Sequence, residues 1–379
     1  MVNDFQYSWI DSDSTLLAMI ETLRNEPLLA VDTEFMRTDT FYPKVALIQI
    51  ASPDNIYLVD PVSLTSLDAL KSLFYSEQLE ALVLHSCSED LEVFKTLWQE
   101  VPGKIFDTQI AAAYLNLERQ PSLQKLLMLL LDIDLPKDET RSNWLQRPLT
   151  DNQKRYAALD VAHLLTVYRT LSDRLEIAGR TEWVNEDCQI LLKKYSASVD
   201  FDNIYRSVGS AWKLQSQQLA VLKLLAAWRD RTAMKKNRPK GHVLKDAVLY
   251  DVAEKMPKNV KDLARCDSLS VGQQKRFGSE LIEMVLEACA LDSSLHPAVL
   301  DKPFSRSHKV LSKKLKAVVE RIAASVDVPA ERLASRKLLE RYAVEKLNGR
   351  AVPSELIGWR FDVLVTELDK VFDAHNESD

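Results

Sequence analysis

The sequence of 379 residues has little glycine and lacks the short motifs that mark several large enzyme classes. Its 8 glycines form neither GxGxxG nor GxxxxGKS/T, which argues against an enzyme that holds a nucleotide cofactor in a glycine-rich loop. Its 4 cysteines lie far apart and contain no CxxC pair, so neither a zinc knuckle nor a disulfide framework is indicated. Isolated thiols of this kind favour a reducing compartment.

Long hydrophobic runs are also missing. No apolar stretch approaches the roughly 18–20 residues that a membrane span needs. The N-terminal segment MVNDFQYSWIDSDST carries acidic side chains where a secretory signal would need basic ones. We therefore expect a cytoplasmic protein that has no membrane partner.

What is present is an ordinary globular composition with an uneven distribution of charge. Hydrophobic residues make up 46% and charged residues 27% of a chain whose length predicts two to three domains. Residues 1–210 hold 19 Lys and Arg against 32 Asp and Glu, whereas residues 211–379 hold 30 against 23, for a total of −6. An acidic part suits divalent cations and a basic part suits a phosphate backbone. Compositional drift between domains is the alternative.

The first half alternates between strand-like and helix-like patterns, which is typical of an α/β fold with a mixed sheet flanked by helices. Three apolar runs separated by turn residues predict adjacent antiparallel strands, and a fourth run predicts a further buried strand. These strands are Leu28 to Phe35, Val45 to Ala51, Ile56 to Asp60 and Ala81 to His85. The predicted helices are 64–75, 86–98 with a capping box at Ser86 and Glu89, 108–117, 123–131 and 151–178.

The second half shows no convincing strand and two helical blocks. Residues 228–239 and 318–329 can be superimposed with a shift of 90 positions, because their apolar and basic positions agree. We therefore expect two small helical domains in tandem. The predicted boundaries are 1–205 for the α/β domain, 211–292 for the first helical domain and 300–375 for the second.

Two acidic residues end the first predicted strand. Asp32 and Glu34 are two positions apart, so a strand directs both side chains to one face. Neighbouring carboxylates repel each other unless a cation or a proton lies between them, which makes an oxygen-ligand site for Mg²⁺ or Mn²⁺ one explanation. A solvated strand end is the other.

Further along the chain, three more side chains could join such a site. Asp90 lies in the first turn of a predicted helix, where an acid also complements the helix dipole without any catalytic role. Tyr156 and Asp160 are four positions apart on a predicted helix and so share one face. They could be a core tyrosine beside a surface acid, or a metal ligand with a hydroxyl close to a bound water.

Taken together, this ordered set resembles the tyrosine branch of the DEDD superfamily of 3′-5′ exonucleases. The strings DTEFMRTDTFYPKVALIQIA, HSCSEDLEVF, IFDTQIAAAYL, RSNWLQRPL and YAALDVAHLL resemble the bacterial ribonuclease D family in particular. The resemblance covers nearly the whole chain, since the two helical blocks look like tandem HRDC domains. It implies an RNase H-like fold for the first domain.

The resemblance also implies a cofactor and the residues that hold it. Asp32, Glu34, Asp90 and Asp160 match the four family acids that hold two divalent ions, Mg²⁺ or Mn²⁺. Asp32 would bridge both ions, Glu34 and Asp160 would complete the site of the attacking water, and Asp90 would support the second ion. Tyr156 matches the tyrosine that orients this water.

Contacts with nucleic acid are expected at two places. Phe35 could stack on the terminal base or belong to the core, and His85 could contact the terminal nucleotide or be a structural histidine. Arg141, Trp144 and Arg147 could anchor a loop or contact phosphate. Basic residues of the first helical block could bind phosphate or form a solvated face: Arg229, Arg231, Lys235, Lys236, Arg238 and Lys240.

The resulting expectation is a metal-dependent 3′-5′ exoribonuclease that releases nucleoside 5′-monophosphates. Its expected partners are RNAs with a single-stranded 3′ end, chiefly tRNA precursors, and a monomer is favoured. A 3′-5′ DNA exonuclease and a catalytically silent RNA-binding protein are the alternatives, because two-metal chemistry does not require the 2′-hydroxyl.

Overall fold

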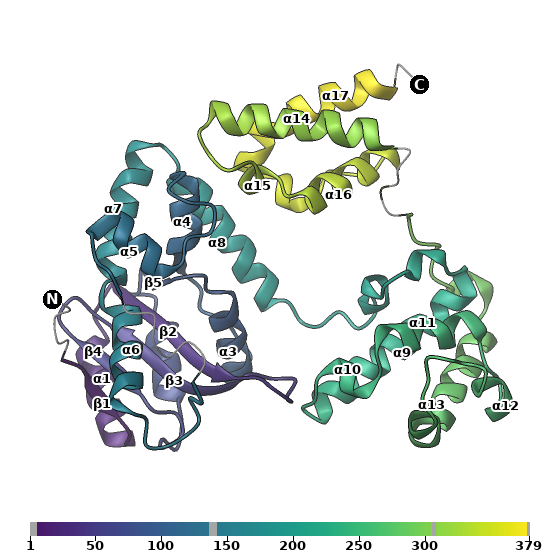
Figure 1. Cartoon of the computed structure of the whole chain (residues 1–379), viewed down its shortest axis with the longest axis horizontal. Coiled ribbons are helices and arrows are strands. Elements are labelled where there is room, and N and C mark those ends of the chain that lie inside the picture. Colours follow the sequence, from purple (N-terminus) through teal and green to yellow (C-terminus); the bar gives the residue numbers. More distant parts are fainter. Residues whose placement is uncertain (1–5, 136–141, 303, 305–307, 377–379) are drawn as a thin grey trace. The chain divides into compact units, whose positions relative to one another are not determined.

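The computed structural model describes residues 6–135, 142–302, 304 and 308–376. The chain divides into two compact units, which can be followed along the sequence in Figure 1. Unit 1 comprises residues 1–36, 43–197 and 306–379, and unit 2 comprises residues 37–42 and 198–305. In the part of the chain that the structure describes, no helix has the length and apolar character needed to cross a lipid bilayer.

Unit 1 is built on a mixed sheet, as predicted. Strand order within the described residues is β1-β4-β3-β2-β5-β6, in which β2, β3 and β4 are antiparallel neighbours and the remaining pairs are parallel. The short strands β1 and β6 were not predicted, because three residues are too few for a periodic pattern. The strands are β1 Ser8–Ile10, β2 Leu28–Met36, β3 Lys44–Ala51, β4 Ile56–Val59, β5 Ala81–Leu84 and β6 Ile105–Asp107.

The strand β2 is longer than its parallel neighbour. Its first half is completely buried at Leu29, Ala30 and Val31, which gives the sheet its apolar centre. Strand β5 pairs with Leu28–Ala30, so the second half of β2 has β3 on one side and, among the residues that the structure describes, no strand on the other. That half carries Asp32 and Glu34.

Helices cover the sheet, and Figure 1 shows α6 beside β2 and β3. One predicted helix, 151–178, is wrong: His163, with φ −111°, separates α6 from α7. This break lets α6 pack on β2, β3 and β4 while α7 packs on β2 and β5. The helices are α1 Asp13–Leu23, α2 Asp68–Phe74, α3 Ser88–Trp98, α4 Thr108–Tyr114, α5 Leu123–Leu131, α6 Asp151–Ala162, α7 Leu164–Ile177 and α8 Thr181–Ser196.

The start of α3 also differs from the prediction. Ser86 does not cap the helix, because its φ of 60° places it in the left-handed region and α3 begins at Ser88. The backbone N–H groups of Ser86 and Cys87 instead donate to the carboxylate of Asp107 at 3.1 and 2.9 Å. The capping box was wrong because a distant carboxylate at the end of β6 supplies the acceptor.

The C-terminal helices belong to unit 1 and attach to it through a buried polar cluster. Arg360 is 7% exposed and donates to Asp187 Oδ1 at 2.6 Å and to the Tyr114 hydroxyl oxygen at 2.9 Å. Beside it the Trp359 ring stacks on Trp183 with centroids 4.3 Å apart. The helices are α14 Lys309–Ser325, α15 Ala330–Leu333, α16 Arg336–Leu347 and α17 Thr366–Asn376, with a π-helical turn Phe361–Val365 before α17.

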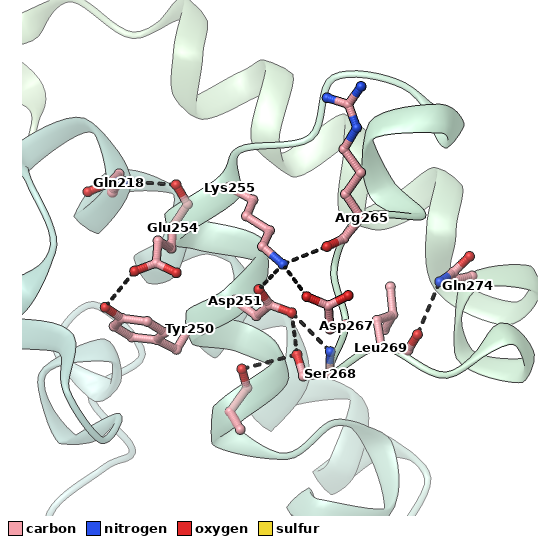
Figure 2. Close-up of polar contacts among 11 residues, drawn as sticks. Gln218, Tyr250, Asp251, Glu254, Lys255, Arg265, Asp267, Ser268, Leu269 and Gln274 are labelled. Carbon is pink, nitrogen blue, oxygen red and sulfur yellow. Dashed lines mark hydrogen bonds and ion pairs between the residues drawn. The ribbon is translucent and has the colours of Figure 1, made fainter.

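Unit 2 is a helical body with its own apolar core. Figure 2 shows polar contacts between α11 and the segment that follows α12. Lys255 at the end of α11 pairs with Asp251 and with Asp267, each at 3.0 Å. Asp251 also accepts a hydrogen bond of 2.6 Å from the Ser268 hydroxyl. These contacts hold the loop that leads to α13. The helices are α9 Ser216–Lys235, α10 Lys240–Val243, α11 Asp246–Lys255, α12 Val260–Leu263 and α13 Val271–Ala290.

The buried pair of Asp187 and Arg360 should dominate the attachment of the C-terminal helices. We expect Asp187→Asn to lower the free energy of unfolding by about 3 kcal/mol, because the guanidinium is left buried without its counter-charge. Near-UV circular dichroism in a denaturant titration would report the loss through the stacked Trp183 and Trp359. The matched control is Glu367→Gln, which removes the surface ion pairs with Arg321 and Lys370 and should change stability by less than about 1 kcal/mol.

Candidate active site

Three carboxylates meet where the second half of β2 faces α6. Asp32 and Glu34 share a face of β2 because of the two-residue period of a strand. Asp160 projects towards them from α6, and one carboxylate oxygen of each of the three residues lies within 4.8 Å of the others. All three side chains are half-buried. The structure thus brings together residues that are about 130 positions apart in sequence.

Asp90 lies next to this cluster but outside it. It is 6% exposed in the first turn of α3, and its Oδ1 accepts a hydrogen bond of 2.6 Å from the Thr33 hydroxyl. Thr33 stands between Asp32 and Glu34 on β2 and faces the opposite way. The hydrogen bond therefore fixes α3 to the strand that carries the other two acids, a role for Thr33 that the sequence did not suggest.

Burial raises the pKa values of all four acids, and neighbouring carboxylates raise them further. Burial raises the pKa of Asp32 well above its usual range, and the charges of Asp90 and Asp160 raise it further. Burial, together with Asp32 and Asp90, raises the pKa of Glu34 to about 9. Burial is also the main cause that raises the pKa of Asp90 to about 7 and that of Asp160 well above its usual range.

This donor set fits divalent cations. Carboxylate oxygens at short mutual distance are the ligands that Mg²⁺ and Mn²⁺ prefer. Burial and the neighbouring carboxylates both disfavour the charged forms of these acids, and a bound cation would favour them. Asp32, Glu34 and Asp160 are the residues placed to hold such an ion, with Asp90 adjacent.

Tyr156 lies one turn before Asp160 on α6. It packs against a small apolar cluster that includes Trp144, with ring centroids 6.3 Å apart. Burial raises the pKa of Tyr156, and the charges of Asp160, Glu34 and Asp32 raise it further. The phenol therefore stays protonated at neutral pH, so it can donate a hydrogen bond but cannot serve as a base.

The segment before α6 supports this tyrosine. Arg147 donates from Nε to Asp60 Oδ2 at 2.8 Å and from Nη2 to the Ala46 carbonyl at 2.7 Å. Trp144 is 3% exposed. These contacts favour loop anchoring over phosphate contact for Trp144 and Arg147. Arg141 lies outside the described residues.

The two predicted nucleotide contacts near the acids differ in their surroundings. Phe35 is half-buried near the end of β2. His85 uses both ring nitrogens internally: Nδ1 pairs with the Thr108 hydroxyl at 2.9 Å and Nε2 with the Pro121 carbonyl at 3.0 Å. Burial is the main cause that lowers the pKa of His85. These contacts favour the structural role for His85.

The basic residues of unit 2 are not equivalent. Arg229 is 5% exposed, donates to Asp230 at 2.8 Å and pairs with Asp246, so its guanidinium is committed to internal contacts. Lys240 is exposed but pairs with Asp230. The exposed side chains that gather on and after the last turns of α9 are Arg231, Lys235, Lys236 and Arg238.

Family models match both parts of the chain. A model described as a 3′-5′ exonuclease matches residues 7–176, and a model of the HRDC domain matches residues 218–285. The first match spans the whole acidic site, from Asp32 to Asp160. The second lies within unit 2.

Whole-chain relatives agree with these matches. The chain is 40% identical over 357 residues to the ribonuclease D of Pseudomonas paraeruginosa, which covers 94% of both chains. It is 30% identical to the ribonuclease D of Escherichia coli K12 over 97% of this chain and 99% of the relative. The crystal structure of E. coli RNase D, an exoribonuclease involved in structured RNA processing, superimposes with a TM-score of 0.91 and 29% identity over 98% and 99% of the two chains.

The pH dependence of stability should reveal the crowded carboxylates. In chelator, we expect the free energy of unfolding to fall between about pH 4.5 and about pH 9, because Glu34 keeps its proton in the folded state while the unfolded chain has released it. The slope is at most about 1.4 kcal/mol per pH unit for each proton retained. Thermal unfolding at several pH values measures it.

A neutral replacement provides the comparison. Glu34→Gln should flatten this slope in chelator and weaken the stabilisation that Mg²⁺ gives at pH 8. Glu77→Gln, which removes an exposed acid from the segment after α2, should change neither quantity. Parallel curves for wild type and Glu34→Gln would contradict the electrostatic description of the site.

Proposed function

Because the chain belongs to the ribonuclease D family and is a 3′-5′ exoribonuclease, we propose that it trims the 3′ ends of tRNA precursors and other small stable RNAs. The products would be nucleoside 5′-monophosphates. The observation that carries the proposal is the cluster of Asp32, Glu34 and Asp160 within the region that matches the exonuclease model. We further propose that the enzyme acts as a cytoplasmic monomer.

Family membership implies divalent metal ions, and we propose that there are two of them, Mg²⁺ or Mn²⁺. Asp32 would contribute to both sites, Glu34 and Asp160 would complete the first, and Asp90 would support the second. Bound divalent ions supply Lewis-acid stabilisation of the oxygens at the reacting phosphorus and acidify the attacking water.

The protein side chains position the reactants. We assign Tyr156 to the tyrosine branch of the superfamily, in which its protonated hydroxyl would donate a hydrogen bond that orients the attacking water. Its raised pKa supports orientation rather than proton removal. Phe35 would stack on the terminal base, whereas the internal contacts of His85 argue for a role in holding the start of α4 and the chain at Pro121.

We propose three domains with boundaries near 1–205, 211–292 and 300–375, of which the last two are both HRDC-like. Their helices follow the same order: a long helix, a four-residue helix after a proline, and a helix of 10 or 12 residues. The residues Asn237 and Asp327, 90 positions apart, both have positive φ, at 45° and 49°. This backbone agreement supports the tandem arrangement.

Two substitutions in the active site, Asp32→Asn and Tyr156→Phe, should separate metal binding from orientation of the attacking water. On an end-labelled tRNA precursor, we expect stepwise shortening from the 3′ end that stops in EDTA and is lost in Asp32→Asn. Tyr156→Phe should lower turnover about 10²-fold or more while the RNA dissociation constant and the metal requirement stay near wild type. Equal losses of turnover and RNA affinity in Tyr156→Phe would contradict its assignment, and faster degradation of a matched DNA strand would contradict the RNA preference.

The exposed basic side chains at the end of α9 should hold the body of the RNA. We expect Lys235→Gln with Lys236→Gln to weaken binding of a tRNA precursor and to reduce the dependence of log K on log salt by about 0.7 for each phosphate that the protein no longer neutralises. Cleavage of a short single strand at saturating concentration should not change. The matched control is Lys193→Gln with Lys194→Gln, an exposed lysine pair in the last turn of α8; an equal effect there would contradict a local binding surface.

A further inference from the structure

One buried side chain beside the acidic site has no hydrogen-bonding partner. Gln49 lies in the middle of β3 and is 0% exposed, and neither Nε2 nor Oε1 of its carboxamide has a partner in the part of the chain that the structure describes. Buried amides without partners are rare in native proteins, since water is lost without replacement. A glutamine in this position therefore calls for a group that it can bind.

The strand register identifies its nearest neighbours. Gln49 is directly opposite Asp32 on β2, and paired side chains of antiparallel strands point to the same face with Cβ atoms about 4.5–5.5 Å apart. On the other side it pairs with Leu58 of β4, which cannot form a hydrogen bond. The carboxamide is thus placed in one row with Asp32, the residue at the centre of the acidic site.

The groups above and diagonal to Gln49 offer few other partners. The helix α6 covers this face beside β2 and β3 (Figure 1), and Leu58 belongs to one apolar cluster with Ala157 and Ala158 of that helix, against which Tyr156 packs. Asp60, beyond Leu58 on the β4 side, already accepts from Arg147 and from Ser63. Asp32 is the acceptor that lies directly across from Gln49 on the neighbouring strand.

We propose that Gln49 is a positioning residue: its Nε2–H has no partner in the metal-free chain and would donate a hydrogen bond to the Asp32 carboxylate when divalent ions are bound, which would fix the orientation of that carboxylate. This inference rests on the proposed function, in which Asp32 contributes to both metal sites. Carboxylates that bind metals depend on such neighbours, and the loss of one costs roughly 10–100-fold in metal affinity. It also explains why β3 tolerates a polar side chain in its otherwise apolar centre.

The test is Gln49→Met, which keeps the length of the side chain and removes both polar atoms. In the full-length protein without metal, we expect a melting temperature equal to or higher than that of wild type, because an unpartnered amide has been removed. With Mn²⁺, measured by calorimetric titration, we expect the affinity to fall roughly 10–100-fold. The Mn²⁺ concentration for half-maximal RNA cleavage should rise by a similar factor, while KM for RNA at saturating Mn²⁺ stays constant.

A control on the opposite face separates this role from simple packing. Ile48→Met changes the adjacent buried residue of β3, which pairs with Thr33 rather than with Asp32, and should leave the Mn²⁺ affinity within about twofold of wild type. A Gln49→Met protein that binds Mn²⁺ like wild type, or that loses stability in chelator, would overturn the inference about Gln49 alone. If wild type itself binds no Mn²⁺, or binds it as well after Asp32→Asn, the metal site and the inference fall together.

Discussion

The burial of a few carboxylates, together with their mutual repulsion, is the constraint around which unit 1 is organised. Asp32, Glu34, Asp90 and Asp160 come from one strand and two helices, and each raises the pKa of at least one other. A fold that gathers them loses stability unless cations arrive. The apolar sheet beneath them provides the compensating free energy, since Leu29, Ala30 and Val31 immediately precede the first acid and are completely buried.

Local periodicity accounts for what the sequence could predict. A two-residue period placed Asp32 and Glu34 on one face, and a spacing of four placed Tyr156 and Asp160 on one face of a helix; both arrangements are present. The antiparallel order of β2, β3 and β4 followed from short turns. That β2 and α6 meet could not follow from periodicity, and only the resemblance to a family brought their residues together in the prediction.

The two wrong predictions about helices, the cap at Ser86 and the single helix 151–178, have their causes in tertiary contacts. Ser86 has the residue type of a helix cap, but Asp107, about 20 positions later, accepts the N–H groups at that end of α3. No glycine or proline marks the break at His163, which separates a helix packed towards β3 and β4 from one packed towards β5, with β2 in contact with both. Gln49 carries no local signal either, since a glutamine within an apolar strand is informative only when its cross-strand neighbour is known.

The net charge summed over the sequence also overestimates the number of cationic side chains that are available to bind RNA. The second half has an excess of Lys and Arg, yet Arg229 and Arg360 are buried in ion pairs, and Lys255 is held by Asp251 and Asp267. A basic residue that neutralises an internal acid adds little to the field that attracts a phosphate backbone. The relevant quantity is the number of exposed cations without an internal partner, so a short stretch at the end of α9 can outweigh a larger count elsewhere.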